Sequence, residues 1–191
     1  MADPLPKPMS FDAYLEWERG QATRHEFVQG RIVAMTGGTQ AHNIIQGNLY
    51  YAVRSKLRGG RCRTFTSDML VHTGRDNGRY PDVTIDCGGF RGDAQTATEP
   101  AVVFEVPSDT TQREDRTRKL ADYNATPSIA QYVLVEQDEA RVYVYSRAAH
   151  GEFSVVPQEI VGLDGTIALP SAGISLSMAE VYEGVATAAA G

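Results

Sequence analysis

The sequence has little of what defines several large protein classes. It contains two cysteines, Cys62 and Cys87, which form no CxxC pair, so a disulfide scaffold and a zinc ribbon are excluded. No apolar run approaches the roughly 20 residues that a membrane-spanning helix requires. The first ten residues lack the pattern of a signal peptide. We therefore expect a cytoplasmic protein with reduced cysteines and no membrane contact.

Length and composition indicate one globular unit. The chain has 191 residues, of which 42% are hydrophobic and 22% charged, as in an ordinary folded protein. Residues 1–9 are rich in proline, and the end of the chain is rich in alanine and glycine. We expect a flexible arm over 1–9, a single domain over 10–185 and a disordered tail over 186–191.

Charge is spread unevenly along the chain. The net charge is −6, yet residues 27–67 contain no Asp or Glu and six basic residues. The total charge argues against tight non-specific coating of DNA, whereas the basic stretch would suit a polyanion. The alternative is a solvated helix face and turn. The candidate phosphate contacts are Arg54, Lys56, Arg58, Arg61 and Arg63.

Hydrophobic periodicity and turn residues predict a mixed α/β sheet with helices on both sides. Helices are expected over 10–17, 42–57, 111–125 and 177–185. A β-hairpin is expected over 25–35, with a turn at Gln29-Gly30. Further strands are expected over 62–72, 81–86, 101–106, 131–135, 142–145, 153–156 and 166–169.

One charged residue interrupts the most apolar of these strands. In Ala-Val-Val-Phe-Glu-Val, residues 101–106, the only polar side chain is Glu105. An unpaired buried carboxylate is too costly to keep, so Glu105 must be protonated, paired with a cation or bound to a metal. An ion pair with an arginine and a metal site are both open at this point.

A second carboxylate opens a neighbouring strand. Asp82 follows Pro81 at the start of the strand expected over 81–86. Two strands that each present one carboxylate offer the hard oxygen ligands that Mg²⁺ prefers, and the backbone carbonyl of Val106 could add a third ligand. The alternative for Asp82 is a turn residue that bonds its own backbone.

Hydrolysis of a phosphodiester at such a metal also needs a cation near the developing charge. The residue two positions after Glu105 would point to the same side of the strand, but it is Pro107. The nearest lysine is Lys119, on the helix expected next. Asp115 lies four residues before it, and the residues alone favour a solvated surface pair between them.

Several short segments, taken in order, resemble one protein family. The order and spacing of these segments, more than any one motif, are similar to those of bacterial restriction-endonuclease-like proteins, a large family expanded in cyanobacteria and belonging to the PD-(D/E)xK nuclease superfamily. The resemblance covers about residues 9–184. Its segments are Tyr80-Pro81-Asp82-Val83, Phe104-Glu105-Val106-Pro107-Ser108, residues 115–120 with Tyr123, residues 25–33, His42, and residues 131–135, 142–145 and 173–176.

This resemblance implies a restriction-endonuclease-like fold, with a central mixed β-sheet flanked by helices and an N-terminal helix and hairpin. It implies Asp82 and Glu105 as ligands of Mg²⁺ or Mn²⁺, with the catalytic lysine moved from the strand to the helix as Lys119. Glu26 and His42 would be outer members of the site. The sequence departs from the family at Pro107, which replaces a small apolar residue and removes a backbone amide at the strand end.

Two functions from different classes follow. The first is a metal-dependent endonuclease that acts on DNA, as a homodimer because duplex cleavage needs two cuts. The second is a nuclease-fold protein that no longer cuts and serves as a nucleic-acid-binding or oligomerisation module, which the net charge and Pro107 favour. The two are separated by whether Asp82, Glu105 and Lys119 converge on one point that solvent can reach.

Overall fold

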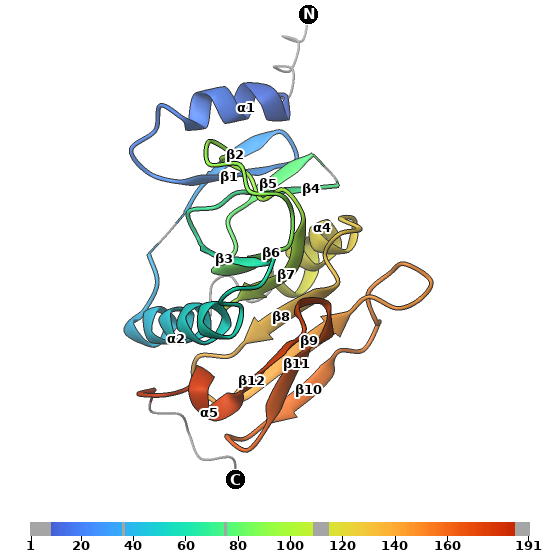
Figure 1. The fold of residues 1–191 in the computed structure, drawn as a ribbon. Helices are drawn as coiled ribbons and strands as arrows, with labels where there is room; N and C mark the ends of the chain where they lie inside the picture. The colour runs from blue at the N-terminus through green and yellow to red at the C-terminus, as the bar shows by residue number, and fades with distance from the viewer. Residues whose placement is uncertain (1–8, 36, 75, 109–114, 186–191) are drawn as a thin grey trace, which may run out of the picture.

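The structure is a computed structural model and describes residues 9–35, 37–74, 76–108 and 115–185. Figure 1 shows its ribbon. The arm expected over 1–9 lies outside the described residues except for Met9, and the tail expected over 186–191 lies outside them entirely.

The described part of the chain contains both helices and strands. The helices are α1 (Phe11–Glu18), α2 (Gln40–Lys56), α4 (Leu120–Asn124) and α5 (Met178–Val181), with a π-helical turn η1 (Asp115–Lys119) and a 3₁₀ turn η2 (Pro170–Ala172). The strands are β1 (His25–Val28), β2 (Arg31–Ala34), β3 (Arg63–Thr66), β4 (Val71–Thr73), β5 (Asn77–Arg79), β6 (Val83–Asp86), β7 (Pro100–Glu105), β8 (Gln131–Val135), β9 (Arg141–Ser146), β10 (Gln158–Val161), β11 (Thr166–Leu169) and β12 (Ile174–Ser177).

A six-stranded mixed sheet forms the centre of the molecule, as expected. Its strand order is β10-β9-β8-β7-β6-β3. Strands β7 and β8 run parallel and the other neighbours are antiparallel. A parallel pair needs a crossover connection, and here the crossover contains η1 and α4. The sheet therefore places the helix that follows Glu105 directly beside the strand that carries it.

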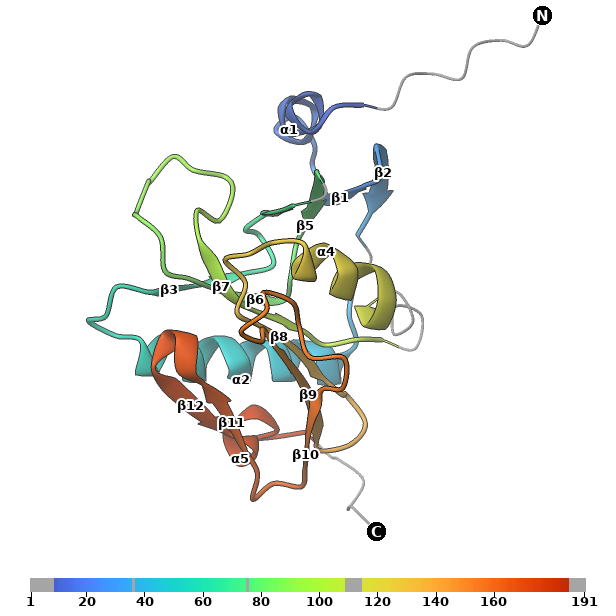
Figure 2. The same ribbon diagram turned by 90° about the vertical axis from the view of Figure 1, so that its right-hand side faces the viewer.

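The two faces of this sheet are covered by different helices (Figure 2). Val102 and Phe104 of β7 belong to a core with α2 and α5. Val103 belongs to a second core with Tyr123 of α4. Because side chains alternate along a strand, Glu105 shares the face of Val103 and points toward α4.

A smaller four-stranded sheet, in the order β2-β1-β5-β4, lies beside the central one and is covered by α1 (Figure 1). Tyr14 of α1 packs with Phe27, Leu70 and Tyr80 in a separate core. The predicted Gln29-Gly30 turn joins β1 to β2. Both turn residues have positive φ, 51° and 78°, which is the conformation that two-residue hairpins favour.

Several strand expectations were wrong. The single strand expected over 62–72 is divided into β3 of the central sheet and β4 of the smaller sheet. The strand expected over 153–156 is replaced by β10, because Val155 and Val156 are 96% and 77% exposed and lie before Pro157. Strands β11 and β12 pair with each other and do not extend the central sheet. Residues 77–79, for which no strand was expected, form β5. In the helix expected over 111–125, residues 111–114 lie outside the described part, and η1 and α4 form the rest.

The two cysteines are joined, contrary to the expectation of free thiols. A disulfide links Cys62 to Cys87. The pairing follows from the sheet register, because Arg63 of β3 lies opposite Asp86 of β6 and each cysteine is the next residue outward. Their separation of 25 residues in sequence hides this proximity.

Candidate functional site

Five site residues proposed from the sequence line one cavity. Its volume is about 340 Å³, and Val106 also contributes to its wall. These residues come from both sheets, from α2 and from η1, so the cavity lies where four parts of the chain meet. The five residues are Glu26, His42, Asp82, Glu105 and Lys119.

The register of β6 and β7 brings the two carboxylates together. Val83 pairs with Phe104 in antiparallel register, so the next residues outward, Asp82 and Glu105, stand opposite each other. The backbone N–H of Val106 donates to Asp82 Oδ2 at 2.7 Å. Asp82 is therefore held from the neighbouring strand and is not bonded merely within its own turn. The N–H of Val106 is already engaged, and its carbonyl stays a predicted ligand.

His42 reaches Asp82 from the first turn of α2. Thr39 caps this helix, and its hydroxyl accepts from the backbone N–H of His42 at 3.1 Å. Nε2 of His42 lies 3.1 Å from Asp82 Oδ1. Gly38 leaves room for the ring, because a Cβ built on this glycine would lie 2.6 Å from His42 Nδ1. Gln46, one turn further along, donates to the backbone carbonyl of Asp82 at 3.0 Å.

Lys119 faces the cavity. Its Nζ lies 2.9 Å from Glu105 Oε2, and the two side chains are only 12% and 5% exposed. The solvated surface position that the residues alone favoured is therefore wrong for Lys119. Its pairing with Asp115 stays a prediction, because the side chain of Asp115 lies outside the described residues. Glu105 is thus paired with a cation, and the cation seen here is a lysine, whereas an arginine was considered from the sequence.

Tyr123 supplies a second donor to the same carboxylate. Its hydroxyl donates to Glu105 Oε1 at 2.7 Å from a fully buried position on α4. Burial raises the pKa of Tyr123 well above its usual value, and the negative charge of Glu105 raises it further. The tyrosine thus stays protonated and remains a hydrogen-bond donor.

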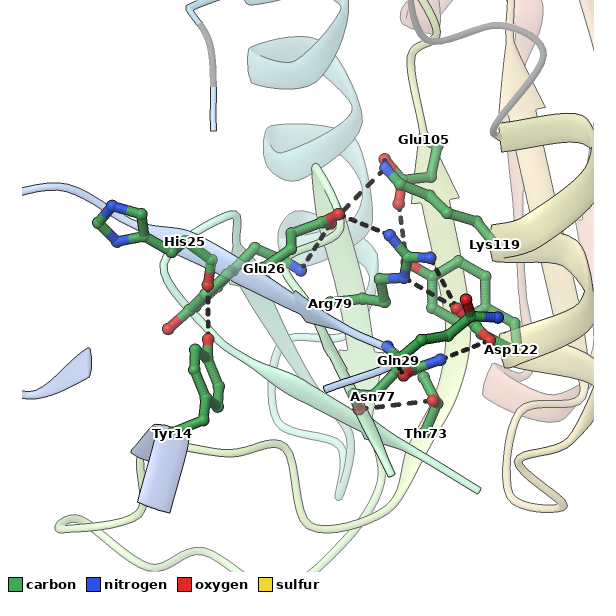
Figure 3. Close-up of polar contacts among 12 residues, drawn as sticks. Tyr14, His25, Glu26, Gln29, Thr73, Asn77, Arg79, Glu105, Lys119 and Asp122 are labelled. Carbon is green, nitrogen blue, oxygen red and sulfur yellow. Dashed lines mark hydrogen bonds and ion pairs between the residues drawn. The ribbon is translucent and has the colours of Figure 1, made fainter. Parts of the chain in front are cut away.

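A buried arginine connects the site to the smaller sheet (Figure 3). Arg79 of β5 has a side chain that is 0% exposed, and its Nη1 donates to Glu26 Oε2 at 2.7 Å. Its Nε and Nη2 donate to Asp122 Oδ2 at 2.9 and 2.7 Å. Burial alone would lower the pKa of Arg79, but Glu26 and Asp122 outweigh it and raise the pKa overall.

The basic residues proposed as phosphate contacts do not line this cavity. Arg54 and Lys56 lie in the last turn of α2, and Arg54 is about 18 Å from His42 because twelve helical residues separate them. Arg54, Arg58 and Arg63 border a separate hollow beside β3. Lys56 pairs with Glu180 at 3.0 Å.

Sequence reasoning gave no role to four residues that hold the site: Gln46, Arg79, Asp122 and Tyr123. Helical spacing could have found three of them. Gln46 follows His42 by four residues, and Asp122 and Tyr123 follow Lys119 by three and four, so each pair shares a helix face. Arg79 has no such signal, because Asn77-Gly78-Arg79 looks like a turn.

The donor set fits a small divalent cation in part. Two carboxylates facing each other, with open cavity beside them, suit Mg²⁺, which needs one or two carboxylates and takes its other ligands from water and phosphate. Within residues 9–35, 37–74, 76–108 and 115–185, no group of three or more His, Cys, Asp or Glu side chains is arranged to hold a metal. A cation here would therefore depend on solvent, backbone or substrate oxygens for most of its ligands.

A match to a family model shows to which family the chain belongs. The family model Uma2, described as "Putative restriction endonuclease", matches residues 11–179. The chain belongs to the Uma2 family. Within that match lie the residues that line the cavity, from Glu26 to Lys119.

The chain is also similar to two curated relatives and to a solved structure. The uncharacterized protein slr1290 of Synechocystis sp. is 31% identical over 96% of this chain and 95% of its own length. A second uncharacterized Synechocystis protein, sll1609, is 27% identical over 81% of this chain and 88% of its own. A crystal structure from Anabaena variabilis, described as a putative nuclease of DUF820, superimposes with a TM-score of 0.72 at 19% identity. It covers 92% of this chain and 98% of its own, and it confirms the fold.

The fold class expected from the sequence is thus confirmed, and the family indicates a nuclease. The sequence contains no run of apolar residues that could span a membrane. In the structure too, every helix in the described part of the chain is too short or too polar to span a bilayer.

Proposed function

We propose that this chain is a cytoplasmic, Mg²⁺- or Mn²⁺-dependent endonuclease that hydrolyses phosphodiester bonds in DNA. One observation carries the proposal. Asp82, Glu105 and Lys119, from two strands and a helix, line the same cavity, and Lys119 contacts Glu105 there. Two carboxylates and one cation at a single solvent-reachable point are the groups that metal-assisted phosphodiester hydrolysis needs.

Asp82 and Glu105 would hold the metal, together with the Val106 carbonyl. The metal would supply positive charge at the phosphate and lower the pKa of a bound water. Tyr123 and Val106 orient the two carboxylates through one hydrogen bond each. His42 fixes the second oxygen of Asp82. Lys119 projects into the cavity, where its ammonium can orient the attacking water or stabilise the charge that develops on the phosphate.

The proposed substrate, DNA, is longer than the cavity and would also contact the protein surface outside it. Arg54 lies about 18 Å from His42 along α2, a span of roughly five base pairs of duplex, and Arg58 and Arg63 border the same hollow as Arg54. These arginines would contact phosphates away from the bond that is cut. Because cutting both strands requires two sites, we also propose a homodimer.

The test is a nicking assay on supercoiled plasmid, run beside melting curves with and without Mn²⁺. We expect nicking that requires Mg²⁺ or Mn²⁺ and a melting temperature that Mn²⁺ raises. A cation at ten times its Kd stabilises the fold by about 1.4 kcal/mol. Asp82→Asn should lose both effects.

The outcomes separate the nuclease from a module that only binds. A Mn²⁺ shift without nicking would mean that the cation site is present while the cutting arrangement is not. Neither a shift nor nicking, together with retained DNA binding, would favour the binding module.

A further inference from the structure

Lys119 lies between two carboxylates that belong to different sheets (Figure 3). Its Nζ lies 2.9 Å from Glu105 Oε2 on β7 and 3.8 Å from Glu26 Oε1 on β1. The shorter contact is a charge-assisted hydrogen bond, whereas the longer one is about 1 Å beyond that range. The ammonium is thus bound to one carboxylate and within a small movement of a second.

Glu26 is held far more firmly than a surface carboxylate. Arg79 donates to its Oε2 at 2.7 Å, and the backbone N–H of Tyr80 reaches its Oε1 at 3.4 Å. Arg79 cannot readily turn away, because the other side of its guanidinium is bonded to Asp122 in the interior. A planar guanidinium holds both carboxylates with a rigid fork of donors, which a lysine at the same position would lack.

Of the two carboxylates beside Lys119, Glu105 is the one that a metal would bind. It stands opposite Asp82 at the ends of β6 and β7, while Glu26 lies on the other sheet. A cation shared by Asp82 and Glu105 would compete with Lys119 for Glu105 Oε2. The Lys119 side chain is only 12% exposed, so it would be costly for its ammonium to leave Glu105 without another carboxylate to accept from it.

We propose that Glu26, locked in place by Arg79, is a positioning residue that receives Lys119 when a divalent cation takes Glu105. This inference rests on the proposed function. The movement shortens the 3.8 Å contact to Glu26 by about 1 Å and leaves the ammonium beside the cavity. Lys119 could then contact the phosphate of the substrate while its ammonium stays paired with the Glu26 carboxylate.

The charges of the cluster are consistent with this arrangement. Among the described residues of the cluster, four carboxylates and two cations leave two negative charges when His42 is neutral, which one divalent cation balances. Arg79 offsets one of the charges that would otherwise hold Lys119 more tightly. The six residues are Glu26, Asp82, Glu105, Asp122, Arg79 and Lys119.

The first test needs no metal. The coupling between Glu26 and Lys119 is measured in EDTA from the urea midpoints of Glu26→Gln, Lys119→Met and the double variant. The cycle is then repeated with Glu105→Gln present, which mimics a Glu105 whose charge is already neutralised. We expect the coupling to increase when Glu105 carries the substitution, because Lys119 turns to Glu26. Equal coupling in both backgrounds would overturn the proposal.

The second test measures Mn²⁺ affinity by calorimetry. Glu26→Gln should raise the Kd at least about threefold, because Lys119 then stays on Glu105, and should lose most of this effect in the Lys119→Met background. An undiminished effect in that background would mean that Glu26 acts on the metal directly, which contradicts the proposal. Arg79→Lys should reproduce Glu26→Gln, and the Glu26–Lys119 cycle decides the matter where Arg79→Lys does not fold.

The outcomes of these tests distinguish a failure of the role proposed for Glu26 from a failure of the proposed function. A protein that binds Mn²⁺ with the expected coupling but does not nick DNA would support the role of Glu26 and contradict the nuclease. Nicking with unchanged coupling in both backgrounds would support the nuclease and overturn the role of Glu26. If Mn²⁺ does not bind, the proposed function and the transfer of Lys119 both fail.

Discussion

Lys119 Nζ lies 2.9 Å from Glu105 Oε2, although the lysine is on η1 and the carboxylate is on β7. The strand position that could present a lysine beside Glu105 is occupied by Pro107. The crossover from β7 to β8 brings the chain back over the face that carries Glu105, and η1 delivers the ammonium from there. The crossover thus supplies the cation that the strand cannot.

Removal of Lys119 should reduce both catalysis and stability. Lys119→Met should reduce nicking at least about 100-fold, as loss of a group that stabilises developing charge does. It should also lower stability by roughly 1–3 kcal/mol, because the buried Glu105 loses its charged partner. The measurements are nicking rates and urea unfolding. The control is Arg19→Met, which removes an exposed cation from the Arg19–Glu16 pair on α1 and should change neither. Nicking at the wild-type rate by Lys119→Met would contradict the assigned role.

The loop before α2 offers a matched pair of glycine substitutions. A Cβ at Gly38 would meet the His42 ring at 2.6 Å, whereas a Cβ at Gly37 would have nothing within 4 Å. Gly38→Ala should therefore move the imidazole away from Asp82 and slow nicking about tenfold or more. Gly37→Ala should nick at the wild-type rate, and both variants should melt near wild type. Equal rates for the two variants would contradict the role of His42.

Reduction of the disulfide should destabilise the protein. The link between Cys62 and Cys87 closes a loop with a sequence separation of 25, for which a loss of roughly 3 kcal/mol is expected on reduction. For a chain of this size that corresponds to a fall in melting temperature of about 6–12 °C. A reductant should produce this fall in wild type and none in Cys62→Ser/Cys87→Ser. A melting temperature that reductant does not change in wild type would show that the bond is absent.

Alkaline pH provides a test of the buried tyrosine beside Glu105. The pKa of Tyr123 is raised in the folded state, first by burial and then by Glu105, so its contribution is complete below the unfolded pKa of about 10 and is lost as pH rises above it. Stability should fall there by up to about 1.4 kcal/mol per pH unit for this residue. Urea midpoints from pH 8 to 11 should fall less steeply for Tyr123→Phe than for wild type.

The Tyr123→Phe variant should also differ from wild type in its stability at pH 8. Tyr123→Phe should be less stable than wild type by roughly 1–2 kcal/mol, because Glu105 loses a donor. Tyr51→Phe, which removes a hydroxyl from a 75% exposed residue, should match wild type at that pH. Identical alkaline slopes for Tyr123→Phe and wild type would contradict the buried hydrogen bond.

The sequence was informative where a pattern is local. Alternation and turn residues predicted the hairpin at Gln29-Gly30, the strand containing Glu105 and the mixed sheet, because each depends on neighbouring residues. A single carboxylate in an apolar strand identified Glu105 as a residue that needs a partner. The family resemblance, not periodicity, selected Lys119 over a surface interpretation.

The sequence failed where register and burial depend on distant segments. Cys62 and Cys87 meet because β3 pairs with β6. Val155 and Val156 look like a strand but are exposed, and the less apolar β10 forms the sheet edge instead. Arg79 looks like a turn residue yet bridges Glu26 and Asp122 in the interior. Each of these outcomes is decided by contacts between elements.

The most direct test of the account is the nicking rate of Glu105→Gln against wild type, with Mg²⁺ or Mn²⁺ titrated over supercoiled plasmid. The substitution keeps the size of the side chain and removes one ligand charge, and Glu99→Gln is its matched control in the exposed loop before β7. We predict metal-dependent nicking by wild type and by Glu99→Gln, and a rate at least about 100-fold lower for Glu105→Gln. Nicking by Glu105→Gln at the wild-type rate, or nicking by wild type that persists in EDTA, would contradict the account.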